Sequence, residues 1–206
     1  MKGCVVLDLD GTLLDCRKRL YTVFSELTGG LNLTEEQYWE LKRNKNDHRK
    51  ILSVLGTWSN QQITEFEHSW LSRIEEKEYL TLDRTFEGVE PFLQRLHQQF
   101  YVVLLTSRQL AENVIWQLKY LDLHPWFHEV RITGKGNTKY KTIQERPLKG
   151  LHPTYLIGDT GEDIRTARKA GFTAIAVTNG FRSQQVLETY CPDMLLSSVI
   201  EFNVLT

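Results

Sequence analysis

Short apolar segments alternate with amphipathic helical segments over most of this chain, and this alternation restricts the possible folds more than any other feature. The apolar segments are continuously hydrophobic, which indicates strands buried on both faces, as in a parallel sheet. They lie at residues 3–9, 101–106, 130–132, 154–157, 173–177 and 194–196. Strands that alternate with helices predict an α/β fold, with a Rossmann-like, doubly wound parallel sheet as its core.

The stretch between the first and second strands has a different character, because no convincing strand occurs from residue 15 to residue 81. Asp15 is placed to cap a helix that Gly29 ends, and Thr34 and Ser59 each open a capping box with a glutamine three residues later. We therefore expect an all-helical module inserted after the first strand. The predicted domains are a core of residues 1–14 and 85–206, and a cap of residues 15–84.

Composition excludes several classes of protein. The chain has 206 residues with a net charge of −1, so it lacks the basic excess of a nucleic-acid-binding protein. No apolar run approaches the ~18 residues of a membrane span, and the three cysteines form no C-x-x-C pair. We expect a cytoplasmic protein that binds neither nucleic acid nor membrane, and composition leaves its oligomeric state open.

Chemically active side chains follow several of the predicted strands. Ligands of open parallel sheets bind outside the carboxyl ends of the strands. The first strand ends at Asp8 and Asp10, the second at Thr106, and the fourth is followed by Asp159 and Asp163. The sequence therefore predicts that these carboxylates and the hydroxyl converge on one edge of the sheet, near a group of lysines at the start of a short helix.

Clustered carboxylates are costly unless a cation neutralises them. Hard oxygen ligands select magnesium over zinc or copper. A magnesium ion next to a lysine and a hydroxyl is an arrangement that handles phosphate. We therefore expect a Mg²⁺ cofactor.

Several segments resemble the haloacid dehalogenase superfamily of hydrolases. Residues 8–15 look like the first motif of the superfamily, the strand that ends at Thr106 like the second, and residues 158–163 like the fourth. The helical stretch is similar to the cap of the phosphoglycolate phosphatase-like branch. The usual Lys-Pro pair of the third motif is missing.

This resemblance implies a role for each matching residue. Asp8 is the expected nucleophile, which forms an aspartyl phosphate, and Asp10 the general acid and base. Thr106 and a lysine are expected to hold the phosphoryl oxygens, and Gly11 to let backbone N–H groups approach them. The metal ligands implied are Asp8, Asp10 through its backbone carbonyl, Asp159 and Asp163, the last of which either ligates the ion or positions another ligand. Thr12, Ser107, Arg108 and Lys141 are further candidates for binding phosphate or substrate.

Two assignments stay open at this point. Lys139 fits the third motif best because a helix is expected to begin there, with Lys141 second and Lys135 third. Arg108 stands where the branch often has another residue, and it either contacts substrate or faces solvent.

The expected function is a Mg²⁺-dependent phosphatase that hydrolyses a small phosphorylated metabolite. Asp10 argues against dehalogenases and phosphonate hydrolases, which lack a second aspartate in this motif. A sugar-phosphate mutase of the β-phosphoglucomutase kind is the alternative, and a non-catalytic binding protein of the same fold is a third hypothesis. The cap is expected to move about hinges at residues 13–15 and 81–88. The sequence does not name the substrate.

Overall fold

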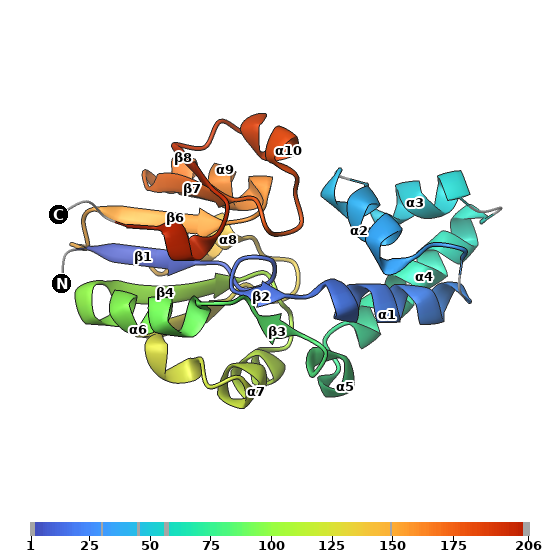
Figure 1. The fold of residues 1–206 in the computed structure, drawn as a ribbon, viewed down its shortest axis with the longest axis horizontal. Helices are drawn as coiled ribbons and strands as arrows, with labels where there is room; N and C mark the ends of the chain where they lie inside the picture. The colour runs from blue at the N-terminus through green and yellow to red at the C-terminus, as the bar shows by residue number, and fades with distance from the viewer. Residues whose placement is uncertain (1–2, 30, 45, 56–57, 149, 204–206) are drawn as a thin grey trace.

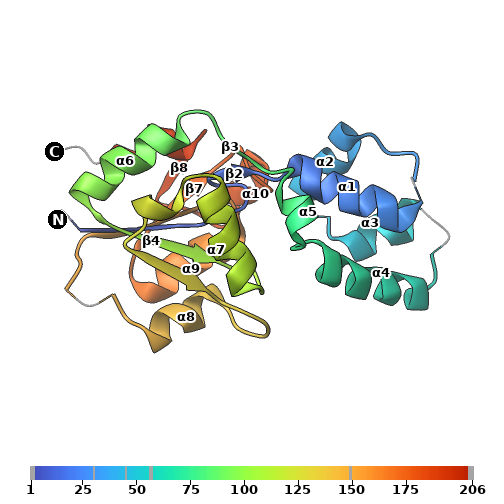
Figure 2. The same cartoon turned by 90° about the horizontal axis from the view of Figure 1, so that it is seen from below.

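The computed structural model describes residues 3–29, 31–44, 46–55, 58–148 and 150–203. A sheet with helices on both faces forms one lobe, and a group of helices forms a second lobe beside one edge of the sheet (Figure 1). A view turned by 90° shows the same two lobes, joined by two thin connections (Figure 2).

The sheet has six strands, and every adjacent pair is parallel. Its strands, in spatial order, are β5 (Glu129–Ile132), β4 (Tyr101–Thr106), β1 (Cys4–Leu7), β6 (Thr154–Gly158), β7 (Thr173–Val177) and β8 (Met194–Leu196). Leu7 at the end of β1 is level with Leu104 and Ile157. The residues that follow β1, β4 and β6 therefore meet at one edge of the sheet.

Successive residues of the strands enter two separate hydrophobic cores. Val5 and Leu7 pack with α6 (Val89–Gln99) and α7 (Ala111–Tyr120) on one face. Cys4 and Val6 pack on the other face. That second face is covered by α8 (Lys139–Glu145), α9 (Gly161–Ala170) and α10 (Gln184–Glu188). Because both faces are covered, the strands must be apolar throughout, and the predicted doubly wound α/β core is confirmed.

The second lobe consists of helices. They are α1 (Arg17–Thr28), α2 (Glu35–Arg43), α3 (His48–Leu55), α4 (Asn60–Arg73) and α5 (Lys77–Leu80). Thr34 and Ser59 form the predicted capping boxes, and Gly29 ends α1 in the left-handed conformation. Helix α3 was not among the expected helices.

The expected role of Asp15 needs correction. Asp15 belongs to β2 (Leu14–Asp15), which pairs with β3 (Arg84–Thr85), and Cys16 is the N-cap of α1. The carboxylate of Asp15 nevertheless accepts the N–H of Arg17 at 3.0 Å. The expected domain boundaries, between residues 14 and 15 and between residues 84 and 85, fall within this antiparallel pair. We retain the division into core and cap as a proposal.

None of the helices in the described part of the chain has both the length and the hydrophobicity that a membrane crossing requires.

Candidate active site

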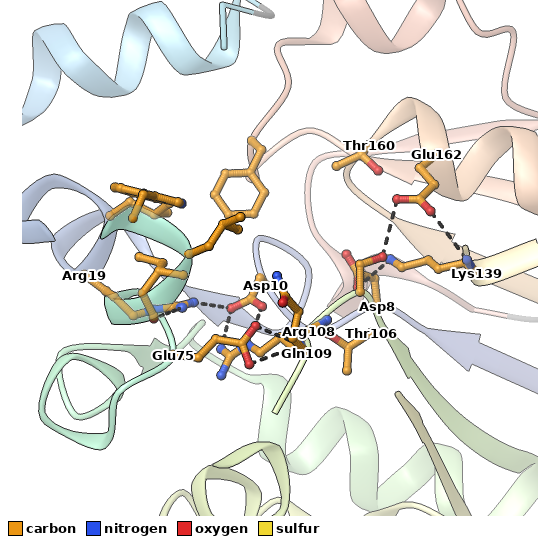
Figure 3. A pocket seen from close by; sticks show the side chains of 16 residues that line it. Asp8, Asp10, Arg19, Glu75, Thr106, Arg108, Gln109, Lys139, Thr160 and Glu162 are labelled. Atoms are coloured by element: carbon orange, nitrogen blue, oxygen red, sulfur yellow. Dashed lines mark hydrogen bonds and ion pairs between the residues drawn. The ribbon is translucent and has the colours of Figure 1, made fainter. Parts of the chain in front are cut away.

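A cleft of about 290 Å³ opens between the carboxyl edge of the sheet and the helical lobe. This volume is near the lower end of the range for ligand pockets. Figure 3 shows the side chains that line it. They are Asp8, Asp10, Arg19, Leu20, Trp70, Leu71, Ile74, Glu75, Thr106, Ser107, Arg108, Gln109, Lys139, Thr160, Glu162 and Phe181.

Lys139 is the lysine that reaches the cleft. Helix α8 begins at this residue, and its Nζ lies 2.6 Å from an oxygen of Asp8 and 2.6 Å from an oxygen of Asp163. Burial alone would lower the pKa of Lys139, but the two carboxylates outweigh it and raise the pKa. Lys139 is therefore a cation held between two carboxylates.

The other two candidate lysines point elsewhere. Lys141 is exposed, and its amino group lies 3.9 Å from Glu145 on the same helix. Lys135 is exposed in the loop before α8. Neither lines the cleft, so we do not retain the prediction that Lys141 binds phosphate.

Asp8, Asp159 and Asp163 form a buried cluster of carboxylates, with one oxygen of each within 4.8 Å of the others. Asp159 is fully buried, and its Oδ2 accepts the N–H of Phe181 at 2.5 Å. Its Oδ1 has no hydrogen-bond partner among the described residues. Burial raises the pKa of Asp159 well above its usual value, and Asp8 and Asp163 raise it further.

A hard cation fits this cluster for two reasons. The donors are carboxylate oxygens, which suit Mg²⁺, and the unpaired oxygen of Asp159 is a buried acceptor that lacks a partner. Both carboxylate oxygens of Asp163 already have partners in the protein. Its Oδ2 accepts the N–H of Thr160 at 3.1 Å, and its Oδ1 contacts Lys139.

Asp10 lies in a second polar cluster. Its carboxylate accepts two hydrogen bonds from Arg108, at 2.7 and 2.6 Å, and one from Arg19 at 2.5 Å. The Cys16 thiol donates a further one at 2.9 Å. Burial alone would raise the pKa of Asp10, but the arginines outweigh it and hold the pKa well below its usual range. The Asp10 side chain is thus not part of the Asp8 cluster, and a metal contact through its backbone carbonyl stays a prediction.

The position of Arg108 decides between the two alternatives left open by the sequence, contact with substrate or exposure to solvent. Its side chain is 4% exposed, so the solvent-facing alternative is wrong. It pairs with Asp10 and, at 3.3 Å, with Asp83. Arg19 of α1 contacts the same two carboxylates. The two arginines and two aspartates form a buried network between the lobes.

Thr106 and Ser107 both line the cleft where β4 ends. Thr106 is buried, and its hydroxyl accepts the N–H of Arg108 at 3.4 Å. Ser107 is exposed, and its hydroxyl donates to Glu162 at 3.4 Å. These positions leave both hydroxyls near the expected phosphate site.

Gly11 and Thr12 are not among the residues that line the cleft. The N–H of Gly11 is already bonded to the carbonyl of Leu14 at 2.8 Å, and that of Thr12 to the carbonyl of Leu9 at 3.3 Å. Gly11 has a φ of +79°, and a Cβ at this position would lie 2.2 Å from Asp159 Oδ2. Glycine is therefore required by the turn and by the close approach of Asp159, and the expected phosphate contacts of Gly11 and Thr12 lack structural support.

Several lining residues were not predicted. Arg19 and Glu75 come from the helical lobe, where sequence periodicity indicates helices but not which side chains face the sheet. Glu162 lies inside the segment 158–163, so its position next to two predicted carboxylates was an available signal.

Fold and site together define a class of α/β enzyme. Its site is a cluster of carboxylates at the carboxyl ends of a parallel sheet, where a lysine contacts two of the carboxylates and a helical lobe lies beside them. The model of the haloacid dehalogenase-like hydrolase family matches residues 5–177. The chain belongs to this family.

Known proteins are similar over nearly the whole chain. A phosphoglycolate phosphatase of Synechococcus elongatus is 23% identical over 202 residues, which cover 94% of this chain and 92% of that protein. The pyrophosphatase PpaX of Halalkalibacterium halodurans is 22% identical and covers 95% and 92%. A solved structure of a haloacid dehalogenase-like family protein from Streptococcus pneumoniae has a TM-score of 0.73 at 23% identity, covering 95% and 94%. The predicted membership of the haloacid dehalogenase-like hydrolases is confirmed.

Proposed function

We propose that this protein is a Mg²⁺-dependent phosphatase that hydrolyses a small phosphate monoester through an aspartyl phosphate on Asp8. One observation carries the proposal: Lys139 bridges Asp8 and Asp163 beside the unpaired oxygen of Asp159, at the floor of a cleft.

In the first step, an oxygen of Asp8 attacks phosphorus and the bond from phosphorus to the leaving oxygen breaks. Lys139 offsets negative charge on Asp8 and on the phosphoryl oxygens. Thr106 offers its hydroxyl to those oxygens from the end of β4. The leaving oxygen takes a proton from Asp10.

In the second step, water gives a proton to Asp10 and attacks the aspartyl phosphate. The bond between phosphorus and Asp8 breaks, which releases inorganic phosphate and restores the Asp8 carboxylate. Asp10 must leave Arg108 and Arg19 to act in either step, because their ion pairs stabilise its charged form. The observed arrangement is therefore a resting one.

Asp8, Asp159 and Asp163 are the residues that would hold Mg²⁺. When bound, the ion supplies charge neutralisation between the Asp8 carboxylate and the phosphoryl group.

The names of the relatives suggest phosphoglycolate and pyrophosphate as first compounds to test. Neither of these names favours the alternative, a sugar-phosphate mutase. A non-catalytic binding protein is disfavoured because Asp8, Asp10 and Asp159 are all present.

The experiment is release of inorganic phosphate from a panel of phosphate esters, with and without Mg²⁺, for the wild type and Asp8→Asn. Asparagine has nearly the same shape but is a poor nucleophile, so we expect kcat to fall by at least about 10³-fold. Asp122→Asn is the matched control. Asp122 is exposed, lies outside the cleft, and has a φ of 55°, which asparagine tolerates.

Turnover that needs Mg²⁺, disappears in Asp8→Asn and survives in Asp122→Asn supports the proposal. Turnover that persists in Asp8→Asn contradicts the aspartyl phosphate. Absence of turnover on every ester, with activity appearing only as isomerisation in the presence of a sugar bisphosphate, favours the mutase.

A further inference from the structure

We infer that the leaving group of the substrate is uncharged and apolar, and not a second anion. This inference rests on the proposed function, because it concerns the part of the cleft beyond the phosphate site. It follows from three features of the described cleft lining: its cations are already paired, its carboxylates are in excess, and its outer wall is apolar.

The cations of the cleft are already engaged. Lys139 contacts Asp8 and Asp163. Arg19 contacts Asp10, Asp83 and the carbonyl of Ile74. Among the described residues that line the cleft, no further lysine or arginine is available to receive a carboxylate or a second phosphate.

Arg108 is also neutralised, by Asp10 and Asp83. When Asp10 leaves the two arginines to act, Asp83 is still the partner of both. Its Nη1 is nevertheless buried and has no hydrogen-bond partner among the described residues. A donor whose charge is already offset suits a neutral acceptor, such as an ester or hydroxyl oxygen, better than an anion.

Carboxylates exceed cations around the cleft. Its lining includes the carboxylates of Asp8, Asp10, Glu75 and Glu162 against the cations of Arg19, Arg108 and Lys139. Asp83, Asp159 and Asp163 lie directly behind this lining, in contact with its charged groups or clustered with Asp8. One Mg²⁺ and one phosphate dianion offset each other, so the excess of negative charge remains when both are bound. A second anion would enter an unfavourable field.

The wall contributed by the helical lobe is apolar. The lining residues from this lobe include Leu20 of α1, Trp70 and Leu71 of α4, and Ile74 after α4, and Phe181 adds an aromatic ring from the core. Figure 3 shows Glu75 turned toward Gln109. The carboxylate of Glu75 accepts hydrogen bonds from the N–H groups of Gln109 and Leu110, so both of its oxygens already have partners in the protein. The wall therefore favours an apolar group by burial.

The test compares three substrates of similar size with alkoxide leaving groups: n-propyl phosphate, phosphoglycolate and phosphoethanolamine, which are uncharged, anionic and cationic beyond the phosphate. We expect kcat/KM with Mg²⁺ to be about tenfold or more higher for n-propyl phosphate than for phosphoglycolate. Equal values, or a higher value for phosphoglycolate or phosphoethanolamine, overturn the inference.

A pair of variants tests the same point from the side of the protein. Leu71 is 52% exposed and lines the cleft, whereas Val54 of α3 is 72% exposed and does not. Leu71→Lys adds a free cation to the wall and should raise the ratio of kcat/KM for phosphoglycolate to that for n-propyl phosphate by about tenfold. Val54→Lys adds the same charge elsewhere and should leave the ratio unchanged. A ratio that rises in both variants, or in neither, contradicts the inference.

Failure of this inference can be distinguished from failure of the proposed function. If phosphoglycolate is the best substrate and its turnover depends on Asp8 and Mg²⁺, the proposed function stands and the inference fails. If the wild type turns over none of the esters, the proposed function fails and the inference falls with it.

Discussion

Asp8 is in an unusual electrostatic position. Burial raises the pKa of Asp8 to about 7, although Lys139 acts in the opposite direction. The pKa in the folded protein is thus above the value of about 3.9 expected in the unfolded chain. Without metal, the stabilisation linked to this proton is complete below about pH 4 and is lost as the pH rises to about 7.

A bound Mg²⁺ ion competes with that proton, which leads to a prediction about thermal stability. Tm measured with and without Mg²⁺ should show a larger increase at pH 8 than at pH 5, since at the higher pH Asp8 has no proton to lose. At a concentration about 100 times its Kd, the ion would stabilise the fold by about 2.7 kcal/mol. Asp8→Asn should reduce both the increase and its dependence on pH. A shift that is the same at pH 5 and pH 8 would show that Asp8 is not a ligand.

At the scale of elements, the helical lobe is docked to the core on two sides of the cleft. On one side, Glu75 follows α4 and accepts the N–H groups of Gln109 and of Leu110, the N-cap of α7. On the other side, Arg43 of α2 donates to the carbonyls of Thr178 and Gly180, both at 2.9 Å. Both contacts join segments far apart in sequence, so each limits how the lobe can move.

We expect Glu75→Ala to lower the free energy of unfolding by about 1–3 kcal/mol, because it leaves N–H groups at the start of α7 without an acceptor. Glu76→Ala is the matched control. Glu76 is exposed and makes no side-chain cap, so its loss should cost less than about 0.5 kcal/mol. Urea denaturation measures both values. Equal losses would mean that Glu75 does not stabilise the junction between the lobes.

At the scale of the whole molecule, the lobes are joined by the short pair of β2 and β3, while β1 and β4 are held within the sheet. A two-stranded pair of two residues each is marginal by itself, so bending is expected there rather than in the core. Closure would exclude water during phosphorylation, and opening would admit it for hydrolysis.

Hydrogen exchange tests this motion. With Mg²⁺ and beryllofluoride, an analogue of the phosphoryl group, exchange should slow by about tenfold in residues 13–15 and 81–88. Residues 102–105, in the middle of β4, serve as an internal control and should not change. The hinge hypothesis fails if exchange in both connecting segments is unaffected while the analogue is bound.

Much of the fold is determined by local sequence pattern. The strands Tyr101–Thr106, Thr173–Val177 and Met194–Leu196 lie where the apolar runs predict them. The capping boxes at Thr34 and Ser59 also follow from residues three positions apart. These features depend on contacts within an element, so the sequence states them directly.

The meeting of Asp8, Lys139, Asp159 and Asp163 was also predictable, because parallel strands place their carboxyl ends at one edge. By contrast, the pairing of Asp10 with Arg19 and Arg108, and the apolar wall of Trp70, Leu71 and Ile74, emerge only in three dimensions. The sequence by itself thus determined the strands and the acidic edge. The tertiary structure alone decided which side chains of the helical lobe face that edge, since this depends on packing between segments far apart in sequence, such as Arg43 and Gly180, which are 137 positions apart.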